Sequence, residues 1–228
     1  MEGCQMPDTV SHQTSAADLW LAAGAALLAA ALITHGPPDP DLSVQMQHIA
    51  DGHGRWALVH WMAAGALFLL SGAGFLAIAT NPAIRRSPVL GSAWMVMALG
   101  ALITISTAVS EATALSVAAD SGDLATFTIW WGFASGMANG FLGLALAVAL
   151  IAYFDLRGTD GRLPGWAAAA GSLFGILSAT GWILGMHLGL SIGGPVWLVS
   201  SLLMCLWLVW FGIAARIPRS TVIPARDV

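Results

Sequence analysis

The 228-residue chain is 57% hydrophobic and only 9% charged, whereas about 25% of the residues in a soluble domain are charged. So few charges exclude a soluble globular domain, because they cannot cover its surface. The formal net charge is −4 and all eight basic residues are arginine, which argues against the dense basic surface of a nucleic-acid-binding protein. The two cysteines, Cys4 and Cys205, are far apart and form no C-x-x-C metal or redox motif.

Six apolar blocks follow one another along the chain, and each can form a helix near or above the ~20 residues needed to cross the hydrocarbon core. Turns rich in Gly, Pro and Asp separate them. The sequence therefore predicts an all-α integral membrane protein with a six-transmembrane-helix bundle. One membrane domain would occupy 19–215, between tails at 1–18 and 216–228. The approximate bounds of the blocks are 19–34, 55–80, 89–117, 124–154, 165–190 and 195–215.

The arginines predict the orientation of the bundle, because cytoplasmic loops are enriched in basic residues. With six crossings, only Arg55 falls on the side opposite to the N-terminus. We therefore expect both termini to be cytoplasmic and the protein to lie in the plasma (inner) membrane. The N-terminal tail has no basic residue before its apolar block, unlike a cleavable signal peptide, so the first block is expected to be retained as a helix. The seven arginines on the N-terminal side are Arg85, Arg86, Arg157, Arg162, Arg216, Arg219 and Arg226.

A short helix is predicted in the first outer loop. Asp41 is a favourable N-cap, and Leu42, Met46 and Ile49 would share one face of the helix that follows. Such an amphipathic segment is expected to lie in the headgroup plane over the bundle.

Histidines are concentrated at the start of the second membrane helix, where the stretch Gln47–Trp61 holds three of the six. His60 would lie about 9 Å below the start of that helix, with His53 on nearly the same face. Glu111 would lie about 9 Å inside the third helix, and His187 in the last turn of the fifth. Ionisable groups at such depth are costly and mark functional sites. We expect a polar pocket at the outer end, with His60 facing the interior within reach of another polar side chain.

Several chemistries suit such a pocket. A transition metal would be bound by His53, His60, Glu111 and His187, because neutral imidazole and carboxylate are common metal ligands. A haem would take His60 and His187 as axial ligands. Histidine and glutamate also pass protons, or simply form hydrogen bonds between helices. The leading hypothesis is a metal or haem protein that transfers electrons at the outer face.

Small residues recur along the fourth and fifth helices. Gly136 and Gly140 on one helix, with Gly175 and Gly185 on the other, predict close backbone contact between the two, because packing drives helix association in lipid. Asn139, near the middle of the fourth helix, is expected to hydrogen bond to a neighbouring helix.

Two other functions remain open from the sequence. The chain would alternatively be an accessory or structural subunit of a larger membrane complex, or a small-solute or proton permease. No catalytic motif predicts an enzymatic activity. The expected partners are the lipid bilayer and either other membrane subunits or further copies of this chain, with no nucleic acid.

Overall fold

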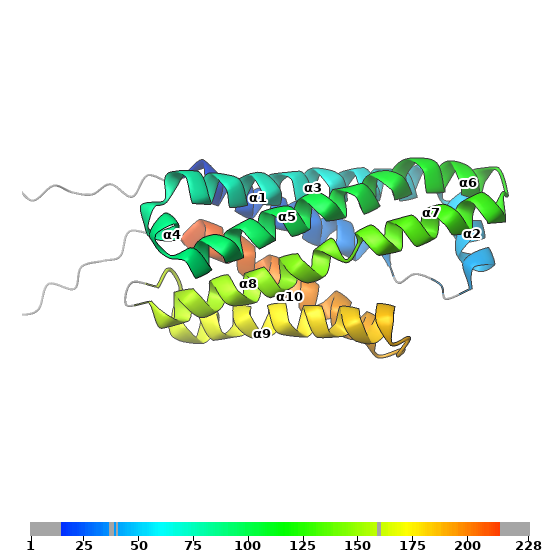
Figure 1. The fold of residues 1–228 in the computed structure, drawn as a ribbon. Coiled ribbons are helices and arrows are strands. Elements are labelled where there is room, and N and C mark those ends of the chain that lie inside the picture. The colour runs from blue at the N-terminus through cyan, green and yellow to red at the C-terminus, as the bar shows by residue number, and fades with distance from the viewer. Residues whose placement is uncertain (1–14, 37–38, 40, 159–160, 215–228) are drawn as a thin grey trace, which may run out of the picture.

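The computed structural model describes residues 15–36, 39, 41–158 and 161–214, and these residues form helices joined by short connections (Figure 1). Six helices are long and apolar enough to cross a membrane, which confirms the predicted all-α bundle. The elements in chain order are α1 (Ala16–His35), α2 (Leu42–Asp51), α3 (His53–Thr80), α4 (Pro82–Arg86), α5 (Pro88–Ser110), η1 (Glu111–Leu115), α6 (Ser116–Asp120), α7 (Leu124–Met137), α8 (Gly140–Arg157), α9 (Gly165–Trp182), η2 (Ile183–His187) and α10 (Gly193–Ala214).

The six spans form a closed ring in sequence order. α1 packs against α3, α3 against α5, α5 against α8, α8 against α9, α9 against α10, and α10 returns to α1. The connections α4 and α8–α9 lie at the same end of the bundle as the start of α1 and the end of α10 (Figure 1). An ion pair of 2.5 Å between Asp18 and Arg162 joins α1 to the α8–α9 connection at this end.

The arginines of the described chain therefore divide between the two ends as the sequence predicted. Arg85, Arg86, Arg157 and Arg162 lie at the end with α4, while Arg55 lies near the opposite end, in the first turn of α3. Arg216, Arg219 and Arg226 lie outside the described residues, as do most of the N-terminal tail and all of the C-terminal tail. Which end faces the cytoplasm stays a prediction.

The α2 end of the bundle is stepped, because the spans differ in length. The span Pro88–Asp120 has 33 residues and Leu124–Arg157 has 34, or about 50 Å each, against about 30 Å for the hydrocarbon core. The helix α1 has only 20 residues, about 30 Å. In Figure 1, α6 and α7 extend beyond the ends of α1 and α9. The step places His35, at the end of α1, beside Glu111 of η1, within the longer third span.

The predicted short helix is present as α2 and packs on α6 and α7. The Asp41 carboxylate accepts hydrogen bonds from the backbone of Ser43 and Val44, and its bonds from Ser43 hold the pKa of Asp41 below its ordinary value. Ile49 is fully buried. With Leu42 and Met46 at its edge, Ile49 joins a second apolar cluster that also contains Leu115, Ala118, Ala119 and Phe127. The expected apolar face of α2 therefore packs against α6 and α7. The position of α2 relative to the lipid headgroups stays a prediction.

The glycine contacts differ in part from the prediction. A Cβ at Gly175 would lie 2.6 Å from the carbonyl oxygen of Ala145, so α9 does approach the α8 backbone. The expectation was wrong for the other three glycines. Gly140 faces Gly100 of α5, Gly185 faces Gly193 of α10, and Gly136 faces open space. For the two glycines of the fourth span, the reason is a turn at residues 138–139, which interrupts that span. Gly136 of α7 is therefore directed away from the face through which α8 packs on its neighbours.

Candidate metal centre

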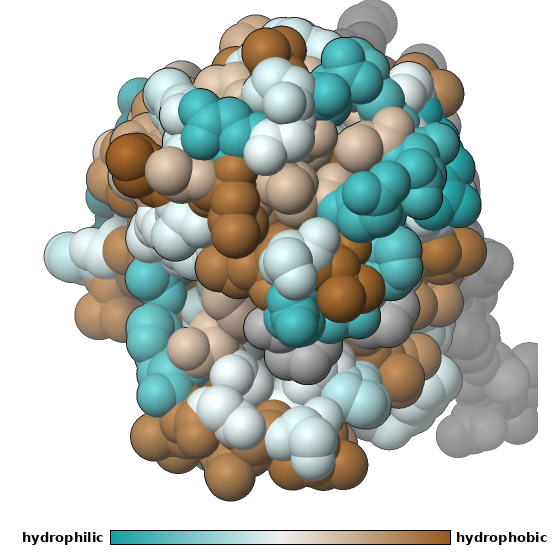
Figure 2. All heavy atoms as spheres, turned by 90° about the vertical axis from the view of Figure 1, so that its right-hand side faces the viewer, coloured by the Kyte–Doolittle hydropathy of each residue, from teal (hydrophilic) through white to brown (hydrophobic). Residues whose placement is uncertain are grey.

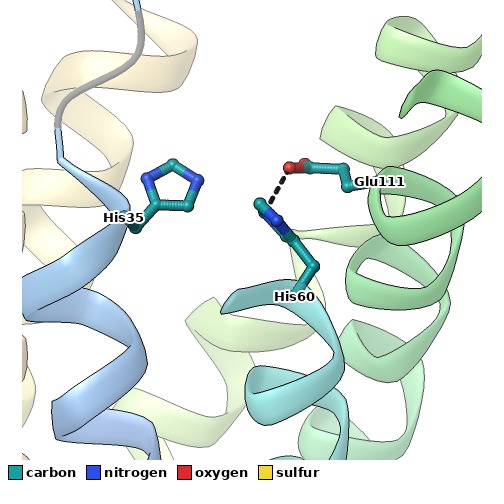
Figure 3. A group of neighbouring side chains, drawn as sticks. All are labelled: His35, His60 and Glu111. Carbon is teal, nitrogen blue, oxygen red and sulfur yellow. Dashed lines mark ion pairs between the residues drawn. The ribbon is translucent and has the colours of Figure 1, made fainter. Parts of the chain in front are cut away.

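The centre of the site is a buried pair between α3 and η1. Nε2 of His60 lies 2.6 Å from Oε2 of Glu111 (Figure 3). His60 is only 5% exposed, so this contact is removed from both water and lipid. The prediction that His60 faces the interior and reaches another polar side chain is confirmed.

Glu111 reaches His60 from a π-helical turn. This wider turn interrupts the third span between α5 and α6. The backbone N–H of Glu111 bonds the carbonyl oxygens of Ala108 and Thr107, and the hydroxyl of Thr113 bonds the carbonyl oxygen of Val109. Hydroxyls that bond back along a helix compete with its regular ladder, and π-helical turns occur frequently at functional sites.

The third member of the site is His35, the last residue of α1. His35, His60 and Glu111 each offer one ligand atom, and these atoms all lie within 4.8 Å of one another. Figure 3 shows a ring nitrogen of His35 directed toward the His60–Glu111 pair. Sequence reasoning missed this role because it ended the first apolar block at residue 34, which left His35 outside the predicted span. The signal was the following Gly36, whose φ of 73° ends the helix directly after the histidine.

Both imidazoles are held in the same way. Nδ1 of His60 lies 2.8 Å from the carbonyl oxygen of Trp56, and Nδ1 of His35 lies 2.6 Å from that of Gly36. A carbonyl only accepts, so each Nδ1 carries the proton, and Nε2 is the nitrogen left for the site. The 2.6 Å contact between His60 and Glu111 then requires one further proton, on either Nε2 or Oε2.

Trp56 forms one wall of the site. Its ring lies 4.4 Å from the His60 ring and 4.9 Å from the His35 ring, between centroids. The two imidazoles meet edge to face at 5.0 Å. These contacts restrict both rings to one orientation, which lowers the entropy that a ligand would have to remove.

A cavity of about 200 Å³ lies against this site on its inner side. Every span contributes to its lining, including His35 of α1, Glu111 of η1 and Trp131 of α7. Most of the remaining lining is apolar, with Leu32 and Phe141 among it. The polar centre therefore borders a largely apolar chamber.

Two of the predicted ligands lie elsewhere. Nε2 of His187 is 2.9 Å from Oδ1 of Asn139, which also accepts from the indole N–H of Trp182 at 3.1 Å. His53 is exposed at the start of α3. Neither belongs to the group of three whose ligand atoms converge. The expectation that Asn139 hydrogen bonds to a neighbouring helix is confirmed, since it joins the α7–α8 turn to α9 and η2.

Two imidazole nitrogens and a carboxylate are a ligand set that binds transition metals and leaves coordination positions open. The same groups without metal would hold one shared proton. Comparison with family models, curated proteins and solved structures finds no match to this chain. The function is therefore argued from the geometry of the site.

Proposed function

We propose that this chain is a membrane metalloprotein in which His35, His60 and Glu111 bind one divalent transition-metal ion. The observation that carries the proposal is the convergence of the three ligand atoms within 4.8 Å. Both histidines also donate Nδ1–H to backbone carbonyls, the arrangement that fixes the tautomer of metal-binding histidines. The ion would replace the proton shared by His60 and Glu111.

The ligand set indicates the chemistry of the ion. Two histidines and one carboxylate hold catalytic zinc with a position left for water or substrate, and they hold non-haem iron(II) in the same way. Since His35 and Glu111 both line the cavity, the open position would face the cavity. The ion would then act on a molecule bound there, as a Lewis acid or, if iron, as a redox centre.

A single ion fits the site better than a haem. Oε2 of Glu111 lies 2.6 Å from Nε2 of His60, the atom that would bind haem iron. His187, the other axial ligand predicted for a haem, has its Nε2 2.9 Å from Oδ1 of Asn139 instead. The ring of His35 contacts the ring of His60 directly, so these two histidines leave no plane between them for a porphyrin either. Electron transfer, the leading hypothesis from the sequence, would then require a redox-active ion in the same three-ligand set.

Elemental analysis and visible absorption of the purified protein test this proposal. We expect about one transition-metal ion per chain and no haem absorption band. His60→Ala should lose the ion, and His48→Ala, which changes an exposed histidine of α2, should keep it. The wild-type protein should be purified without a histidine tag or chelator and then incubated with zinc or iron(II). If it still contains no metal, the proposal is overturned.

A solute or proton permease is the second candidate, and the broken fourth span supports it. Transporter helices are often discontinuous at the substrate site, and the turn at residues 138–139 precedes α8. Flux into proteoliposomes that is abolished by Asn139→Leu but not by His60→Ala would favour this function. If neither metal nor flux is found, the best proposal becomes an accessory subunit of a larger complex. Such a subunit would lie in the plasma membrane with both termini inside. The native mass of the extracted protein tests this proposal.

A further inference from the structure

The two ionisable side chains of the cavity lining, His35 and Glu111, lie together. The hydroxyl of Thr104 donates to the carbonyl oxygen of Gly100, and that of Thr107 donates to the carbonyl oxygen of Ala134. Both hydroxyl protons are therefore used within the protein. The ionisable groups of the lining, His35 and Glu111, stand at the outer end. A molecule that fills the cavity would need an apolar body and one polar end.

The size of the cavity restricts the apolar body to a single chain. An engineered apolar cavity of about 150 Å³ stays dry and binds benzene, and the cavity here is about 200 Å³. One short alkyl chain fits that space, and the two chains of a diacyl lipid do not. The walls provide aromatic and branched aliphatic contacts, among them Leu28, Leu67 and Phe141.

The connection between α9 and α10 provides an apolar rim beside the cavity. Leu188 is 61% exposed, Leu190 48% and Ile192 58%, and Met186, which lines the cavity, is 44% exposed. Figure 2 looks onto this end and shows hydrophobic side chains along its lower edge, where Figure 1 places this connection. Closely spaced exposed apolar residues at the end of a membrane helix are expected to contact lipid.

The cavity lies between two groups of helices that separate toward this end. α7 packs against α5, η1, α6 and α2, while α9 packs against α8 and α10. The lining includes Ser135 of α7 on one side and Gly185 of η2 on the other. A Cβ at Gly132 or Gly136 of α7 would meet nothing within 4 Å.

From these observations we infer that the cavity binds a single-chain amphiphile from the lipid leaflet that surrounds the α2 end. The alkyl chain occupies the cavity below the metal centre, and the polar head group lies at His35 and Glu111. This inference rests on the proposed metal site for the role of the head group. The occupancy of the cavity by the chain depends on the cavity alone.

Photolabelling of the full-length protein in phosphatidylcholine nanodiscs tests the inference. The probe is a medium-chain fatty alcohol with a diazirine at the end of its chain. Mass spectrometry of the digested protein should find the label on the inner part of the cavity lining, such as Leu67 and Phe141. Labelling confined to lipid-facing residues, such as Phe68 and Phe75 of α3, would overturn the inference.

Two variants with the same substitution on one helix sharpen the test. Ala63 of α3 lines the cavity and Ala79 is exposed on the same helix. Ala63→Phe should reduce cavity labelling about tenfold, equivalent to about 1.4 kcal/mol of binding free energy, and Ala79→Phe should not. Equal labelling of the two variants would contradict the inference. If Ala63→Phe fails to fold, the position of the label in the wild-type protein still decides.

Competition separates this inference from the proposed function. An unlabelled fatty alcohol should displace the probe at lower concentration than the alkane of equal length, and His60→Ala, without metal, should weaken the advantage of the alcohol. Bound metal without cavity labelling would support the metal site and contradict the inference. Cavity labelling with equal competition by alcohol and alkane would support the chain and overturn the role of the head group. Cavity labelling in a protein that never binds metal would overturn the proposed function alone.

Discussion

His60 and Glu111 come from different spans, 51 positions apart in the chain, and their side chains meet at 2.6 Å between Nε2 and Oε2. The pair brings α3 and the π-helical turn of the third span together at the point where α1 ends. Because Trp56 holds the other nitrogen of His60, the imidazole is satisfied on both sides. A buried polar group without a partner costs free energy, so the pair contributes to folding as well as to the site.

Loss of this pair should destabilise the bundle. Glu111→Leu leaves Nε2 of His60 without its partner, and we expect the free energy of unfolding to fall by about 1–3 kcal/mol. Glu111→Gln keeps a hydrogen-bonding group and should cost less. Thermal unfolding of the metal-free protein in detergent measures both. Equal stability of the leucine variant and the wild type would show that the contact contributes nothing.

The glycine contacts predict opposite results for two neighbouring positions. A Cβ at Gly140 would lie 2.6 Å from the carbonyl oxygen of Gly100, whereas one at Gly136 would meet nothing within 4 Å. Gly140→Ala should therefore destabilise the protein by about 1–3 kcal/mol through overpacking. Gly136→Ala should be neutral or stabilising, since alanine is the better helix former. The reverse order of melting temperatures would contradict the packing of α8 on α5.

Asn139 should hold the broken fourth span to the fifth. Asn139→Leu removes the acceptor for Trp182 and His187, at a cost of about 0.6 kcal/mol for each interhelical hydrogen bond in a membrane. Asn139→Asp keeps an oxygen acceptor and is the matched comparison. Amide hydrogen exchange near the end of α9 should accelerate in the leucine variant. Unchanged exchange there would show that the bonds do not order η2.

The cap of α2 should depend on pH. Bonds from Ser43 hold the pKa of Asp41 below its ordinary value in the folded protein, so the cap stabilises α2 above the ordinary carboxyl pKa. This stability is lost as the pH falls through the lowered pKa. Exchange of the Ser43 and Val44 amides should therefore accelerate at acid pH. Asp41→Asn, which caps the helix without titrating, should remove the pH dependence of this exchange. If the exchange of the variant still depends on pH, the dependence comes from another group.

The sequence was sufficient for the six spans, since their length and apolar composition leave few alternatives. It also placed His60 and Glu111 in one polar pocket, with His60 within reach of another polar side chain, because the cost of burying each group requires a partner. It did not predict His35, whose direction depends on the residue at which α1 stops. The π-helical turns were not predictable either, because the hydrophobic periodicity of the sequence does not mark them.

The partner of Gly140 shows the same limit. Glycines at four-residue spacing predicted a helix contact, but not which neighbour would make it. The turn at residues 138–139 changes the direction of the glycine face between α7 and α8, and no proline marks that turn in the sequence. Hydrophobic periodicity, which was read as one continuous helix, contains no information on this break.

Metal content of four alanine variants tests the central claim most directly, because it separates the ligands that the structure brings together from those that it does not. His35→Ala and His60→Ala should each lose the ion, while His53→Ala and His187→Ala should keep about one ion per chain, measured by elemental analysis of folded protein. Retention of the ion by His35→Ala together with its loss in His187→Ala would contradict the account.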